Sequence, residues 1–261
     1  MSGYAQRAPF YRSEFAVADD FPLLEQLLAG DGGLVIDIPS GAGRLLLVHQ
    51  AHGRDVIMVD IEPAMTAQCR QGAASLGLTP RVMAMNGDIT TWQAPRPAAR
   101  VVVARGGLQM LPSSQAIAQA LTASAANLAD GGLLYLDVAM PWTAAPHAAC
   151  HLPAFLRFAA NTRLQGSDCI QVGSATQIRR SYTSTLLPDR AVVHFRYQAA
   201  GTPAGQWQDF EADASWRRVD VSGVLGALEN NHLTVISMLG DYAGAPYTSG
   251  SARFICIAAG R

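Results

Sequence analysis

Two aspartates in this chain follow buried apolar runs, and a tight glycine turn lies directly after the first of them. Three apolar residues lead into Asp37, and the turn behind it contains Gly41 and Gly43. A second apolar run, residues 56–59, ends in Asp60. This strand–turn–crossover–strand pattern is typical of a nucleoside-binding crevice at the carboxyl edge of a parallel sheet. Asp60 suits a ribose, because one carboxylate can accept hydrogen bonds from both hydroxyls of a cis-diol.

The glycine spacing narrows the choice of nucleoside. A dinucleotide fingerprint requires a third glycine at the position that Leu46 occupies. Asp37 also disfavours a pyrophosphate, because two negative groups repel each other at close range. A cofactor that carries a cation suits this carboxylate better, and S-adenosylmethionine carries both an ammonium group and a sulfonium.

Five segments together resemble the motifs of the class I S-adenosylmethionine-dependent methyltransferases. The resemblance covers about residues 20–140 and the final hairpin, and the intervals between the motifs also fit. The segments are residues 35–43, 58–65, 87–89, 102–109 and 128–132. One departure is Pro39, which replaces the usual first glycine and lacks an N–H that could bind the cofactor.

The resemblance implies a set of residues that contact the cofactor S-adenosylmethionine. These residues are Asp37, Pro39, Ser40, Gly41, Gly43, Asp60, Ile61, Met65, Gly87, Asp88, Ile89, Arg105 and Gly106.

The elements that position these residues alternate between strand and helix. Apolar runs at residues 35–38, 56–59, 81–85, 100–104 and 133–138 predict strands, and helical patterns separate them. Such alternation predicts an α/β fold with a Rossmann-like, doubly wound sheet. The acidic residues Asp19 and Asp20 are expected to cap a helix that ends near Gly30. The resemblance implies seven strands in the order 3-2-1-4-5-7-6, with strand 7 antiparallel.

The pattern changes after residue 140. Segments 178–187, 192–197 and 206–216 alternate apolar and polar residues, which predicts an antiparallel β insertion after strand 5. We therefore expect a methyltransferase core at residues 1–140 and 221–261, in which residues 1–30 form an N-terminal cap. Residues 141–220 are expected to form an inserted lid, as in similar small-molecule N- and O-methyltransferases.

Several residues are candidates for the methyl-acceptor site, each with a plainer alternative. Tyr11, His147 and His151 are candidate catalytic residues, and the simpler alternatives are a surface tyrosine on a capping helix and solvent-facing loop histidines. The candidate substrate-binding residues are Tyr4, Gln109, Trp142 and Arg180. Core packing for the tryptophan and a solvated strand face for the arginine are the alternatives.

The histidines and cysteines give no sign of a metal site. His147, Cys150 and His151 form an isolated H-x-x-C-H without a partner cluster, so no metal is expected. His49 and His52 are expected at the surface of a helix.

Composition limits the partners and the chemistry. The formal net charge of −1 gives no reason to expect nucleic acid or an anionic membrane as a partner. No 18-residue apolar stretch and no signal-peptide pattern occur, so a bacterial cytoplasm is the expected location. All 19 basic residues are arginine, which excludes chemistry that depends on a lysine amine.

The leading functional hypothesis is methyl transfer from S-adenosylmethionine to a nitrogen or oxygen of a small metabolite, in secondary metabolism. The sequence leaves the oligomeric state open, with a homodimer as one option. One alternative is a methyltransferase-fold protein that binds the cofactor without methyl transfer, as a cyclase, a decarboxylase or a partner subunit. A nicotinamide oxidoreductase is disfavoured by the missing third glycine and by the absence of a Tyr-x-x-x-Lys pair.

Overall fold

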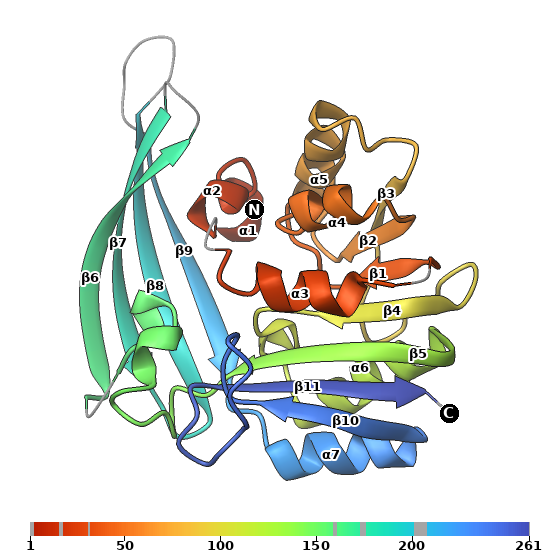
Figure 1. Ribbon diagram of the computed structural model, residues 1–261. Coiled ribbons are helices and arrows are strands. Elements are labelled where there is room, and N and C mark those ends of the chain that lie inside the picture. Colours follow the sequence, from red (N-terminus) through yellow and green to blue (C-terminus); the bar gives the residue numbers. More distant parts are fainter. Residues whose placement is uncertain are drawn as a thin grey trace.

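Two β-sheets divide the chain into an α/β core and a sheet that stands beside it (Figure 1). The computed structural model describes residues 3–15, 18–30, 32–158, 161–172, 176–200 and 208–260. Within these ranges, the longest helices fall well short of the length and apolar character needed to cross a membrane.

Seven strands build the sheet of the core, in the order β3-β2-β1-β4-β5-β11-β10. All neighbours are parallel except β11, which runs antiparallel to both β5 and β10. The prediction of a doubly wound sheet in the order 3-2-1-4-5-7-6 is therefore confirmed. The strands are β1 (Val35–Asp37), β2 (Val56–Asp60), β3 (Val82–Asn86), β4 (Ala98–Val103), β5 (Leu128–Ala139), β10 (Leu233–Leu239) and β11 (Arg253–Gly260).

Helices cover both faces of this sheet, which explains why its strands are apolar on both sides. Val35 packs with α3 (Phe21–Leu28), α4 (Leu46–His52) and α5 (Pro63–Ser75). The next residue, Ile36, belongs to the cluster on the opposite face, with α6 (Ser114–Ala126) and α7 (Val221–Asn230).

Side chains cap α6 and α7, whereas the cap expected for α3 does not form. Ser113 and Asp220 accept hydrogen bonds from the first turns of α6 and α7. Asp20 stands at the N-cap of α3, but its carboxylate makes no capping bond. Both of its oxygens bind Arg44 instead, at 2.8 and 2.5 Å, and this ion pair replaces the expected cap.

The second sheet is antiparallel, in the order β6-β7-β8-β9. Its strands are β6 (Arg163–Val172), β7 (Thr176–Leu186), β8 (Arg190–Ala200) and β9 (Gln208–Arg217). Alternate residues, including Ile178, Phe195 and Trp216, are buried in a cluster with Phe155 of the short 3-10 helix η3 (Ala154–Leu156). We call this sheet, with η3 and the 3-10 helix η2 (Ala149–His151), the lid.

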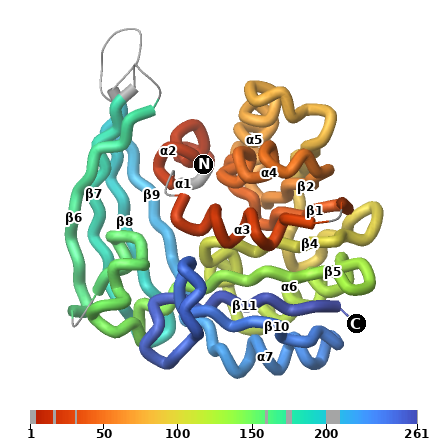
Figure 2. Tube along the Cα trace, in the orientation of Figure 1, coloured from red at the N-terminus to blue at the C-terminus, as the bar shows by residue number. Residues whose placement is uncertain are grey.

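Two short helices, α1 (Gly3–Arg7) and α2 (Tyr11–Glu14), lie between the lid and the core (Figure 2). Contacts with β6 and β9 on one side and with α5 on the other place them there. Their buried anchor is Glu14, which accepts hydrogen bonds from Arg7 at 2.8 Å, Arg180 at 2.8 Å and the Tyr197 hydroxyl at 2.6 Å. The N-terminal segment is thus tied to lid strands β7 and β8.

Glu14→Gln should lower the free energy of unfolding by about 3 kcal/mol, because it leaves two buried guanidinium groups without their shared carboxylate. Arg7 and Arg180 are 1% and 6% exposed, so little water reaches them, and Arg180 keeps a second carboxylate partner, Asp168. Chemical denaturation measures the effect. The control is Asp189→Asn, which breaks an exposed ion pair with Arg190 and should leave the denaturation midpoint unchanged. Equal midpoints for both variants would contradict this role of Glu14.

Candidate functional site

A cavity of about 600 Å³ opens between the carboxyl edge of the core sheet and the lid. Small-molecule sites commonly have volumes of roughly 300–1,000 Å³, so the cavity is large enough for a nucleoside and a second small ligand. Eleven of the residues expected to act in the site line it. They are Tyr11, Asp37, Pro39, Ser40, Gly41, Asp60, Ile61, Met65, Arg105, His151 and Arg180.

The end of β1 supplies two buried polar atoms that have no hydrogen-bond partner among the described residues. These atoms are Asp37 Oδ2 and Ser40 Oγ, and both residues line the cavity. Buried polar atoms are almost always hydrogen-bonded in folded proteins, so unpartnered atoms in residues that line a cavity point to a ligand-binding role for those residues. A cationic group of a ligand would satisfy the carboxylate.

The end of β2 holds Asp60 in a fixed orientation. One carboxylate oxygen accepts the Gly41 N–H at 2.8 Å, and the other accepts the Glu62 N–H at 2.9 Å. Burial raises the pKa of Asp60, the two backbone donors oppose that rise, and the nearby Asp37 adds to it. Each oxygen keeps a further lone pair, so the carboxylate can still accept hydrogen bonds from a diol.

The glycine turn allows the backbone to approach the cavity closely. Gly41 has φ +55°, and a Cβ at this position would lie 2.8 Å from Cε1 of Tyr11. A side chain there would be strained and would collide with the tyrosine ring. Tyr11 of α2 therefore covers the turn from the N-terminal side.

Beneath the cavity, the buried Asp137 of β5 joins several segments. It accepts hydrogen bonds from Arg253 at 2.8 Å, the Tyr242 hydroxyl at 2.7 Å and the Arg105 backbone N–H at 3.0 Å. Burial alone would lower the pKa of Arg253, but Asp137 and Tyr242 raise it above its ordinary value. This cluster forms a rigid base for the residues that follow β4.

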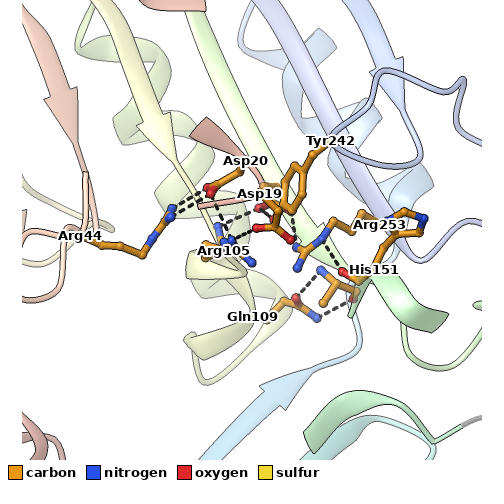
Figure 3. A network of polar contacts seen from close by, with 10 residues as sticks. Asp19, Asp20, Arg44, Arg105, Gln109, His151, Tyr242 and Arg253 are labelled. Carbon is orange, nitrogen blue, oxygen red and sulfur yellow. Dashed lines mark hydrogen bonds and ion pairs between the residues drawn. The ribbon is translucent and has the colours of Figure 1, made fainter. Parts of the chain in front are cut away.

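Arg105 connects this base with the N-terminal segment (Figure 3). Its guanidinium bonds Asp19, lies 3.1 Å from Asp20 and is 5.1 Å from the Tyr242 ring centre. Burial by itself would raise the pKa of Asp20, yet Arg44 and Arg105 lower it below its ordinary value. The two aspartates before α3 thus hold the arginines at the edge of the cavity.

Some residues of the expected site do not line the cavity. Gln109 is buried, and its amide bonds the backbone of Ala139 and Arg217, which joins β5 to β9. The Trp142 indole donates to the Leu187 carbonyl at 2.7 Å. His147 is exposed on its loop, and the Tyr4 side chain lies outside the described part.

Five residues of the expected cofactor set also lie outside the cavity lining. Gly43 and Gly106 adopt positive φ angles within turns. Asp88 accepts two hydrogen bonds from Thr90, each 2.8 Å long. Gly87 and Ile89 are the other two, and Ile89 is buried in the core.

The structure also brings to the cavity residues that sequence reasoning missed. They are Arg7, Glu14, Asp19, Arg44, Phe155, Asp168 and Trp216, among others. The sequence did carry a signal for Asp19, since an acidic pair before a helix can bind arginines as readily as it caps the helix. No local pattern connects Glu14 with the lid, because its partner Arg180 lies 166 residues further along the chain.

Comparison with known proteins gives one family match. Residues 35–132 match the family model described as a methyltransferase domain. This range begins at β1 and ends within β5. A comparison with curated proteins finds no match.

Solved structures share the architecture over almost the whole chain. The sugar N-methyltransferase KedS8 from Streptoalloteichus superposes with a TM-score of 0.72 at 18% identity, over 97% of this chain and 91% of that one. The amino pentose methyltransferase CalS10 from Micromonospora echinaspora gives 0.67 at 18% identity, over 96% and 94%. An S-adenosylmethionine-dependent methyltransferase from Clostridium acetobutylicum gives 0.71 at 11% identity, over 93% and 90%. Residues 35–132 therefore match a methyltransferase domain, and the chain shares the fold of these S-adenosylmethionine-dependent methyltransferases, as its motifs predicted.

Proposed function

We propose that this protein transfers a methyl group from S-adenosylmethionine to a nitrogen of a small polar metabolite, with an oxygen acceptor as the less favoured choice. The observation that carries the proposal is a single cavity that joins Asp37 and Asp60 of the core to the lid residues Phe155, Arg180 and Trp216. One chamber with a nucleoside half and a lid half suits two reactants that must meet in line.

The core half of the cavity fits the cofactor. The Asp37 carboxylate would take the ammonium group, and Asp60 would accept the ribose hydroxyls. Ile61 is 67% exposed and lines the cavity, so it offers an apolar surface to the adenine. The bound cofactor supplies a methyl group that its own sulfonium activates. The protein therefore needs to supply chiefly alignment and exclusion of water.

The lid half of the cavity combines apolar surface with carboxylates that are paired with arginines. Phe155, Ile170 and Trp216 supply the apolar surface, and Glu14, Asp19 and Asp168 each form an ion pair with an arginine. An amino group of an acceptor can donate hydrogen bonds to the lone pairs that these carboxylates keep. The structural likeness to proteins named as a sugar N-methyltransferase and an amino pentose methyltransferase supports an amino sugar as one such acceptor.

His151 is the candidate proton acceptor. It lies at the cavity from η2, whereas His147, four residues earlier, does not line it. An amine attacks only with its lone pair free, so a base at this place would take the proton that the acceptor releases.

Asp60→Ala should weaken the binding of S-adenosylhomocysteine about 100-fold, because two hydrogen bonds between a charged group and the ribose are lost. Titration calorimetry measures the dissociation constant. The matched control is Asp130→Ala, an exposed aspartate on β5 outside the cavity, which should bind like wild type. Unchanged affinity in Asp60→Ala would refute the assignment of the ribose site.

As the pH is lowered, the affinity for S-adenosylhomocysteine should begin to fall while the pH is still above 3.8, the ordinary pKa of an aspartate. The reason is that burial raises the pKa of Asp60, and the protonated form loses acceptor capacity for the ribose. Calorimetry from pH 7 to pH 4, with circular dichroism to confirm folding, measures this dependence. A constant affinity over that range would contradict it.

His151→Gln should lower kcat about tenfold with an amine acceptor, because the base that would take the released proton is lost. The production of S-adenosylhomocysteine in the presence of candidate amines measures turnover. His147→Gln serves as the control on the same loop and should keep the wild-type kcat. Equal losses in both variants would assign the effect to the loop and not to a base at His151.

A further inference from the structure

His49 of α4 is buried beside the cofactor half of the cavity, although its place on a crossover helix suggested a surface position. Its side chain is 1% exposed, and its Nε2 lies 3.7 Å from Asp37 Oδ2. Neither ring nitrogen has a hydrogen-bond partner among the described residues, and the same is true of that carboxylate oxygen. A buried imidazole next to a buried carboxylate, both unsatisfied, requires a physical explanation.

The two residues occupy different positions relative to the cavity. Asp37 lines it and His49 does not, so the histidine approaches the carboxylate from the side of α4. Negative charge is concentrated here, because the charge of Asp37 contributes to the raised pKa of both Cys69 and Asp60. Burial is the larger cause in each case.

The type of residue matters for a site that binds a cation. An arginine beside Asp37 would carry a permanent positive charge and would compete with the ammonium group of a ligand. A neutral imidazole can direct an N–H toward one carboxylate oxygen and leave the negative charge available. The separation of 3.7 Å is slightly longer than a hydrogen bond, so a small shift of either side chain closes it.

We propose that His49 is a positioning residue for the cofactor: its Nε2–H orients the Asp37 carboxylate from behind, so that this carboxylate binds the ammonium of the amino-acid moiety. This inference rests on the proposed function, and it assigns a role to a residue outside the cavity. It requires that His49 affects only ligands that carry the ammonium group.

Two ligands and two variants of similar shape test this role. S-Adenosylhomocysteine carries the ammonium, whereas 5′-methylthioadenosine has the same nucleoside without the amino-acid moiety. His49→Gln keeps an N–H at a similar distance along the side chain, and His49→Met removes it with little change in length. His49→Met should weaken the binding of S-adenosylhomocysteine about tenfold and change the affinity for 5′-methylthioadenosine less than twofold. His49→Gln should keep most of the wild-type affinity for S-adenosylhomocysteine.

The controls separate positioning from a loss of folding. His52→Leu alters the other histidine of α4 and should leave both affinities unchanged, and thermal unfolding reports the stability of each variant. In the Asp37→Asn background, His49→Met should cause no further loss for S-adenosylhomocysteine. If the methionine variant does not fold, His49→Leu replaces it, and the comparison with His49→Gln is made in the same way.

The outcomes distinguish the two hypotheses. If His49→Met weakens the binding of both ligands equally, or of neither, the proposed role of His49 is wrong. The proposed function still stands in that case, provided that the wild-type protein binds S-adenosylhomocysteine. Wild-type protein that binds neither ligand overturns the proposed function and this inference with it.

Discussion

A carboxylate removed from water must be hydrogen-bonded, and Asp137 meets this demand with groups from three separate segments. Its partners are Arg253 of β11, Tyr242 of the loop between β10 and β11, and the backbone of Arg105 after β4. The removal of Arg253 would leave the buried charge of Asp137 without its ion pair, which is costly. Because Arg105 is fixed in this way, its side chain can hold Asp19 and Asp20, and the edge of the cavity is built outward from one buried group.

A second buried carboxylate, Glu14, does for the lid what Asp137 does for the core. It joins α2 to β7 and β8 through Arg180 and Tyr197, while Arg7 lies among the rings of Phe195 and Tyr197. The two clusters enclose the cavity from opposite sides. Its shape therefore depends on charged contacts between segments far apart in the chain, and a methyl donor and an acceptor placed there would be held by two rigid walls.

The core of the fold could be predicted because buried parallel strands and glycine turns leave local patterns. The apolar run before Asp37 and the turn at Gly41 indicated the sheet edge, and the structure has the expected strand order. β6 was not predicted as a separate strand, because Gly166, Ser167 and Asp168 interrupt its alternation. Gln109 shows a similar limit: its bonds to Ala139 and Arg217 join distant elements, which residue spacing cannot reveal.

The carboxyl ends of β1 and β2 are proposed to bind S-adenosylmethionine, and the rest of the site depends on this assignment. Titration calorimetry of the wild-type protein with S-adenosylmethionine, S-adenosylhomocysteine and NAD tests it. We expect one site per chain with micromolar affinity for both adenosyl ligands and no heat from NAD. Binding of NAD, or of none of the three, would show that the turn at Pro39 does not bind S-adenosylmethionine and would refute the assignment.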